Sequence, residues 1–91
     1  MEEEIFLNKV FQYNNGIFLS VFESDDGWDY ALYSSDYHEL DTGMYDDPNI
    51  DFDSVLDILE SENNLNGDSK IEINYDEFNK NIYLNMDEEK W

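Results

Sequence analysis

Aspartate is the residue type in this sequence that is best suited to form a functional site, and its densest run is DTGMYDDPNIDFD, residues 41–53. Five of these thirteen residues are aspartate, and none is basic. Clustered carboxylates can ligate a hard cation such as Ca²⁺, can cap helices and turns, or can present negative charge to a basic partner. The first and third possibilities would each be a functional site.

A calcium site needs a spacing that the chain does not provide. In an EF-hand loop the sixth residue is glycine and the twelfth is a bidentate glutamate. In residues 66–78 (NGDSKIEINYDEF), Glu77 in twelfth place puts Ile71 where glycine is required, and Gly67 in sixth place puts Ile73 in twelfth. No register of residues 41–53 supplies both positions either. We therefore predict no dedicated metal site and no cofactor.

Catalytic side chains are equally scarce. The chain has one histidine, His38, and neither cysteine nor arginine. A nucleophile, a base and an orienting group would have to come from serines and that single imidazole. Paired carboxylates could act on a glycoside, but such pairs arise by chance among 24 acidic residues. We predict that the protein is not an enzyme.

The overall charge favours a basic partner. The chain has 24 acidic residues and four lysines, for a net charge of −20. A net charge of magnitude about 2 to 8 is enough to keep a small domain soluble. The net charge of −20 repels nucleic acid and anionic membranes. Disordered acidic chains are poor in aromatic residues, but here 16% of residues are aromatic and 41% hydrophobic. We predict that residues 1–91 fold as a single acidic α+β domain.

No segment predicts export or membrane insertion. The N-terminal MEEEIF is acidic where a signal peptide is basic, and no apolar run approaches the length of about 18 residues that spans a bilayer. The absence of cysteine is typical of a reducing compartment. We expect a cytoplasmic protein.

The first half of the chain has the pattern of an antiparallel meander. Runs rich in aromatic and β-branched residues alternate with polar turns that contain glycine, as at 14–16 and 25–27. The predicted strands are residues 4–13, 17–23, 28–33 and 39–45.

The second half predicts one helix and one hairpin. From Phe52 to Leu59, apolar residues follow the i, i+3, i+4, i+7 spacing of one helical face. We expect a helix over about residues 53–62, with Asp51 or Asp53 as its N-cap. Residues 70–75 alternate between polar and apolar, and the apolar residues at 82, 84 and 86 repeat this pattern, which predicts a C-terminal hairpin. The predicted fold class is α+β: a curved antiparallel sheet, formed by a meander of about four strands and this hairpin, with one helix packed on a face.

The predicted helix carries a row of acids. Asp53, Asp57 and Glu60 lie at i, i+4 and i+7, so they would be spaced about 6 and 4.5 Å apart along its axis. Phosphates of one DNA strand are spaced by about 3.4 Å, and no basic residue between residues 39 and 66 neutralises the row. We predict a partner-binding surface that joins this row to the preceding loop, an aromatic anchor and a second patch at a hairpin end: Asp46, Asp47, Asp51, Asp53, Asp57, Glu60, Tyr45, Asp25, Asp26 and Asp29.

The chain resembles two groups of proteins. Its size, acidity and lack of cysteine are similar to those of anti-CRISPR proteins and other phage or mobile-element inhibitors of host defence. Residues 29–33 (DYALY), 39–43 (ELDTG) and 45–50 (YDDPNI) resemble the β-meander-plus-helix domains of large polyvalent proteins of phages and conjugative elements. Both resemblances imply a mobile element, and therefore the cytoplasm of a bacterial host cell.

Two functions remain open. In the first, the protein is a non-enzymatic inhibitor whose carboxylates replace nucleic-acid phosphates in the basic groove of a host defence protein, such as a CRISPR effector. In the second, it is an accessory protein-interaction domain of a phage or conjugative element, without DNA mimicry. The first predicts a basic nucleic-acid-binding protein as partner, and neither predicts direct binding of nucleic acid or of a membrane.

Overall fold

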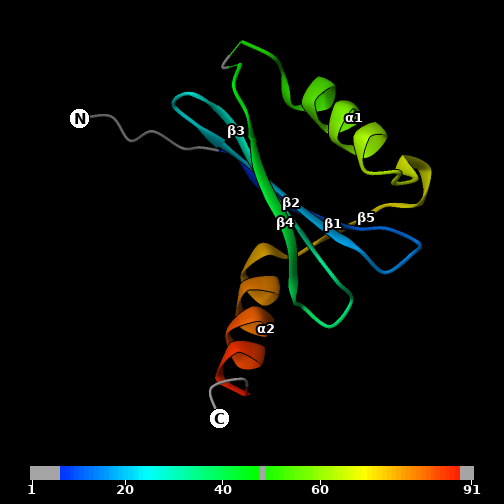
Figure 1. Cartoon of the computed structure of the whole chain (residues 1–91), viewed down its shortest axis with the longest axis vertical. Coiled ribbons are helices and arrows are strands. Elements are labelled where there is room, and N and C mark those ends of the chain that lie inside the picture. The colour runs from blue at the N-terminus through cyan, green and yellow to red at the C-terminus, as the bar shows by residue number, and fades with distance from the viewer. Residues whose placement is uncertain (1–6, 48, 89–91) are drawn as a thin grey trace.

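The computed structural model of the chain describes residues 7–47 and 49–88, with side chains as far as Leu84. These residues form a five-stranded antiparallel sheet, two α-helices and a short 3₁₀ turn, η1 (Figure 1). The fold class is α+β with a curved sheet, as predicted. In chain order the elements are β1 (Asn8–Gln12), β2 (Phe18–Ser24), β3 (Gly27–Tyr33), β4 (Glu39–Tyr45), α1 (Phe52–Glu62), η1 (Gly67–Ser69), β5 (Ile71–Ile73) and α2 (Tyr75–Glu88).

The strand order in the sheet is β4-β3-β2-β1-β5. Consecutive strands of the meander pair with each other, and β5 returns to pair with the free side of β1. All four strands predicted for the first half are confirmed, and β4 has both predicted ends. The first strand was expected to begin at residue 4, and its portion before residue 7 lies outside the described residues.

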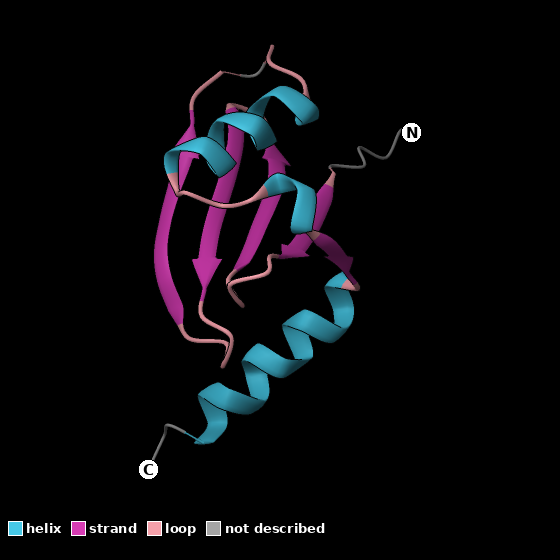
Figure 2. Cartoon of the chain, turned by 90° about the vertical axis from the view of Figure 1, so that its right-hand side faces the viewer, coloured by secondary structure: helices cyan, strands magenta, loops and turns pink. Residues whose placement is uncertain are grey.

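One face of the sheet packs against α1 (Figure 2). Alternation along β2 directs Leu19 and Val21 to this face, where both are fully buried in one cluster with Val55 and Leu59 of α1. Each apolar side chain of this size contributes about 1.5–3 kcal/mol when it is removed from water. The helical spacing from Phe52 onward is therefore confirmed as the face that docks α1 on the sheet.

The opposite face packs against α2, so the two helices lie on opposite sides of the sheet (Figure 1). Phe78 of α2 is buried with Val10 and Phe18 of the sheet. Its ring centroid lies 5.0 Å from that of Phe18 and 5.2 Å from that of Tyr33, within the range of favourable aromatic pairs. This small aromatic cluster is what holds α2 to the sheet.

The predicted C-terminal hairpin is wrong. Of the predicted hairpin, Ile71–Ile73 form a strand, whereas residues 75–88 are the helix α2 instead of a second strand. The described residues therefore contain two helices rather than one. Asn74 explains the change, because its side-chain oxygen accepts a hydrogen bond from the Glu77 N–H at 3.0 Å and so satisfies a free donor at the start of the helix. Ile71, an apolar residue of the alternation that predicted the hairpin, has a side chain that is 65% exposed.

Candidate functional site: the acidic end of the sheet

Two of the predicted acidic segments meet at one end of the sheet, at the top of Figure 1. Asp25 and Asp26 form the turn between β2 and β3, and both are exposed. Gly27 follows them with φ of +151°, and a side chain there would begin 2.1 Å from the Tyr45 carbonyl oxygen and 2.9 Å from the Asp47 nitrogen. The glycine therefore lets the chain that leaves β4 pass directly against the hairpin turn, which brings the carboxylates of both segments to the same end.

The start of α1 is held at this end as well. The indole N–H of Trp28 donates a hydrogen bond to the Ile50 carbonyl oxygen at 3.1 Å, and its ring lies 5.7 Å from the ring of Phe52. These contacts fix the loop before α1, so the exposed Asp51 and Asp53 lie near the two acidic turns. We call this group the acidic end: Asp25, Asp26, Asp46, Asp47, Asp51 and Asp53.

Some of these aspartates also shape the backbone. Asp51 is the N-cap of α1, as predicted, and its side chain accepts a hydrogen bond from the Ser54 N–H at 3.0 Å. Hydrogen bonds from the Ser54 side chain and backbone hold the pKa of the Asp51 carboxyl below its usual value. Asp47 accepts from the Asn49 N–H at 3.0 Å and so fixes the turn after β4. These two carboxylates both belong to the acidic end and hold it in place.

The predicted position of Glu60 is wrong. Asp53 and Asp57 are exposed on α1, but the Glu60 side chain is turned into the protein and is 7% exposed. The predicted row of three acids is therefore a row of two. The segment that follows α1 folds back over this face of the helix, and residue spacing within the helix does not reveal such a cover.

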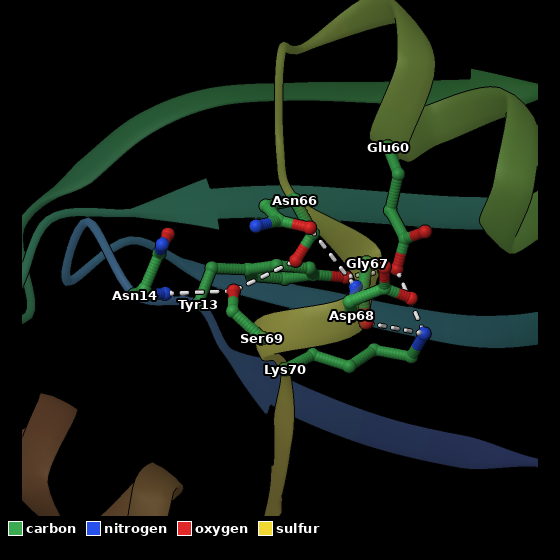
Figure 3. Close-up of polar contacts among 8 residues, drawn as sticks. All are labelled: Tyr13, Asn14, Glu60, Asn66, Gly67, Asp68, Ser69 and Lys70. Atoms are coloured by element: carbon green, nitrogen blue, oxygen red, sulfur yellow. Dashed lines mark hydrogen bonds and ion pairs between the residues drawn. The ribbon is translucent and has the colours of Figure 1, made fainter.

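Glu60 belongs to a buried polar cluster (Figure 3). The Tyr13 hydroxyl donates a hydrogen bond to the Glu60 carboxylate at 2.8 Å, and the Lys70 ammonium lies 3.1 Å from the same oxygen. Lys70 also donates to the Gly67 carbonyl oxygen at 3.2 Å. A side chain at Gly67 would begin 2.4 Å from the other Glu60 oxygen, so glycine lets η1 pack this closely without a shift of the Glu60 carboxylate. The cluster joins α1, η1 and the hairpin between β1 and β2, and its role is structural.

Lysines also reach the exposed face of α1. Asp53 and Asp57 line a shallow cleft of about 560 Å³ together with Lys9, Lys70 and Glu72. Lys9 forms an ion pair with Glu72 at 3.0 Å. The sequence interval around α1 contains no basic residue, but folding brings two lysines beside it, so the field of the α1 acids is less negative than the sequence suggests.

Two further predicted site residues lie elsewhere than expected. Tyr45 was expected to be an exposed anchor, but it is partly buried and packs against the core under α1. Asp29 does not join Asp25 and Asp26 at the turn, because its side chain lies on the α2 face of β3 and lines a groove there. Large apolar side chains exposed on the described strands were not predicted as site residues: Phe22, Leu40, Met44 and Ile71.

The described residues contain no metal site or membrane span. Among the residues whose side chains are described, 7–47 and 49–84, no three histidine, aspartate or glutamate side chains gather in a way that could hold a metal ion. No helix within these ranges has the length and apolar character that crossing a membrane requires. His38 lies in an exposed turn, with its Nδ1 3.9 Å from the Asp36 carboxylate.

The fold and the surface together define a small acidic α+β domain with an open antiparallel sheet and a helix on each face. The chain matches the family described as large polyvalent protein-associated domain 16 over residues 7–84, and it belongs to this family. The match confirms the resemblance to domains of large polyvalent proteins and indicates a phage or mobile-element context. No curated protein and no solved structure matches the chain. The resemblance to anti-CRISPR proteins stays a prediction.

Proposed function

We propose that this domain is a non-catalytic protein-interaction domain that binds the basic, nucleic-acid-binding surface of another protein through its acidic end. One observation carries the proposal: Gly27 and Trp28 bring aspartates from three separate segments to one end of the sheet. Within the described residues, none of these six carboxylates forms an ion pair. Their charge is therefore available to a partner.

The expected partner surface is rich in lysine and arginine. Exposed carboxylates on one end of a protein steer a basic partner into contact and raise the association rate at low ionic strength. Salt screens such contacts, with a Debye length of about 10 Å at 0.1 M. The interaction should therefore weaken as salt rises.

In the narrower form of the proposal, the carboxylates occupy the positions of nucleic-acid phosphates, and the domain competes with DNA or RNA for the groove of its target. The mobile-element context supports a host defence protein as target, such as a CRISPR effector. The burial of Glu60 limits the phosphate-like row on α1 to Asp53 and Asp57, so the turns at the acidic end have to supply most of the charge.

The test compares two variants with equal net charge. The first changes five residues of the acidic end to asparagine: Asp25, Asp26, Asp46, Asp47 and Asp53. Asp51 is kept because it caps α1, and asparagine preserves the oxygen with which Asp47 accepts its hydrogen bond. The control neutralises five exposed acids elsewhere by the same isosteric changes: Glu39, Asp41, Glu62, Asp68 and Glu77.

Tagged wild-type protein and both variants are used to capture partners from the lysate of a CRISPR-bearing bacterium, with washes at low and high salt. We expect wild type and the control to retain a basic nucleic-acid-binding protein, and the acidic-end variant to lose it. Competing duplex DNA should displace the partner if the narrower form holds. Equal loss by both variants would mean that only total charge matters, and a partner indifferent to salt and DNA would contradict the proposal.

A further inference from the structure

The second helix leaves an area of its sheet face open. Figure 2 shows α2 running along the lower end of the strands and away from them. It docks through Phe78, whose ring meets those of Phe18, Tyr33 and Tyr37 near the turn that joins β3 to β4. Farther along the same face, the side chain of Phe22 is 40% exposed and that of Met44 is 47% exposed.

A groove of about 400 Å³ lies between this open face and α2. Its floor is made of small residues on neighbouring strands, because Ser20 pairs with Ala31 and Ala31 pairs with Thr42. The groove has the volume of a typical ligand pocket, and aromatic and aliphatic side chains line its walls. These wall residues are Phe22, Tyr33, Tyr75, Phe78 and Ile82.

The charge of the groove indicates what it can accept. Asp29 is the one charged residue among the described residues that line it. Two residues before Asp29, β3 begins at Gly27, beside the turn that carries Asp25 and Asp26. The side of the groove that carries Asp29 is therefore the side nearer the acidic end, and negative charge increases in that direction.

We propose that the groove binds a short segment of the basic partner in which an apolar side chain is followed by lysine or arginine. This inference rests on the proposed function. The apolar side chain would lie over Ala31 between Phe22 and Phe78, and the basic side chain would reach Asp29. The two sites are separated by two strand residues, or about 7 Å, which is a spacing of about two residues in an extended peptide.

Charge decides between this occupant and the others. A second copy of the chain would bring another net charge of −20 to the same face, and nucleic acid would be repelled in the same way. An apolar segment without basic residues would bury the Asp29 carboxylate beside it with no compensating charge, which is costly. A basic segment with an apolar anchor would cover the exposed Phe22 side chain and pair with the Asp29 carboxylate. It also fits the general pattern in which a few buried anchors dominate binding.

The test begins with a display library of random twelve-residue peptides selected on the wild-type protein. Enriched peptides are synthesised with a fluorescent label, and their affinity is measured by anisotropy. We expect them to combine an apolar residue with lysine or arginine, and to perturb the backbone amide resonances of Ala31 and Thr42. No enrichment, or enriched peptides that bind without these shifts, would overturn the proposal.

Matched variants locate the binding. Phe22→Ser should weaken the peptides about tenfold, whereas Tyr83→Ser removes an aromatic side chain that is 70% exposed outside the groove and should have no effect. Asp29→Asn should weaken them about threefold and reduce the salt dependence, and Asp68→Asn serves as its charge-matched control. Asp29→Asn is isosteric and at the surface, so it stays informative even where Phe22→Ser lowers stability. If each control variant weakened peptide binding as much as the groove variant it is paired with, the groove would not be the binding site.

The acidic-end variant separates this inference from the proposed function. If it binds the basic protein as wild type does while Phe22→Ser weakens peptide binding about tenfold, the groove stands and the proposed function fails. If it loses the partner while Phe22→Ser and Asp29→Asn bind every peptide normally, the proposed function stands and the groove inference fails.

Discussion

At the scale of single residues, Tyr13 shows how the domain tolerates a buried carboxylate. The Tyr13 side chain is 3% exposed, and its hydroxyl donates to Glu60. Burial raises the pKa of the Tyr13 phenol above its ordinary value, and the hydrogen bond to the Glu60 carboxylate and the charge of that carboxylate raise it further. The neutral phenol donates a hydrogen bond to the Glu60 carboxylate and the Lys70 ammonium pairs with it, and without these partners this carboxylate would be costly to bury.

This environment predicts a stability change at alkaline pH. The pKa of Tyr13 is higher in the folded than in the unfolded state, where it is about 10. Its contribution to the free energy of unfolding is therefore fully present below about pH 10 and is lost as the pH rises above that value. Urea unfolding at pH 9 and pH 11 should show a smaller loss of stability in Tyr13→Phe than in wild type.

The same variant tests the hydrogen bond at neutral pH. Tyr13→Phe removes a buried donor to Glu60 and should destabilise the fold by about 1–3 kcal/mol. In wild type, absorbance at 295 nm should show one tyrosine that ionises only as the protein unfolds, and this step should be absent in the variant. Ionisation of that tyrosine while the protein is still folded would contradict the assigned environment.

At the scale of elements, the pattern of the sequence predicts the meander and α1 but not α2. Aromatic and β-branched runs between turns mark the strands of the first half, one helical period marks α1, and each of these elements is confirmed. Near the C-terminus, a strand period and a helix period compete. The apolar residues at 82, 84 and 86 alternate as in a strand, whereas Tyr75, Phe78 and Ile82 have helical spacing. Asn74 followed by Glu77 is a helix-start signal that could have decided between them.

The acidic end could be predicted only partially. The turns and the N-cap Asp51 follow from local sequence, because each depends on hydrogen bonds within a few residues. The burial of Glu60 does not, because it depends on Tyr13 and Lys70, which are distant from it in the sequence. The approach of Gly27 to the chain after β4 is likewise a tertiary contact.

The docking of α2 depends on one ring. Phe78→Ala should remove the contacts with Phe18 and Tyr33 and cost about 3 kcal/mol, near the lower end for a buried phenylalanine. This corresponds to an increase of about 100-fold in the population with α2 undocked. Hydrogen exchange should accelerate in α2 far more than in α1, because α1 packs on the other face. The exposed Tyr83→Ala is the control and should leave exchange unchanged. Equal acceleration in both helices would show that the two faces unfold as one unit.

At the scale of the whole molecule, repulsion among carboxylates opposes the compact state. The net charge is −20, and the folded domain measures 42 × 37 × 20 Å. At an ionic strength of 0.01 M the Debye length is about 30 Å, which exceeds the thinnest dimension, so charges on opposite faces repel each other. At 1 M the length falls to about 3 Å, and only neighbouring charges still interact.

We therefore predict that the domain becomes more stable as salt is added. Relief of about 1 kcal/mol would raise the Tm by about 4–8 °C in a domain of this size, and thermal unfolding in 0.01 M and 0.5 M NaCl measures the change. Choline chloride at equal ionic strength should give the same rise, since screening does not require sodium to bind. The acidic-end variant, with five fewer charges, should show a smaller rise. A fall in Tm would mean that the ion pairs Lys9–Glu72 and Lys70–Glu60, which salt weakens, outweigh the net repulsion in the folded state.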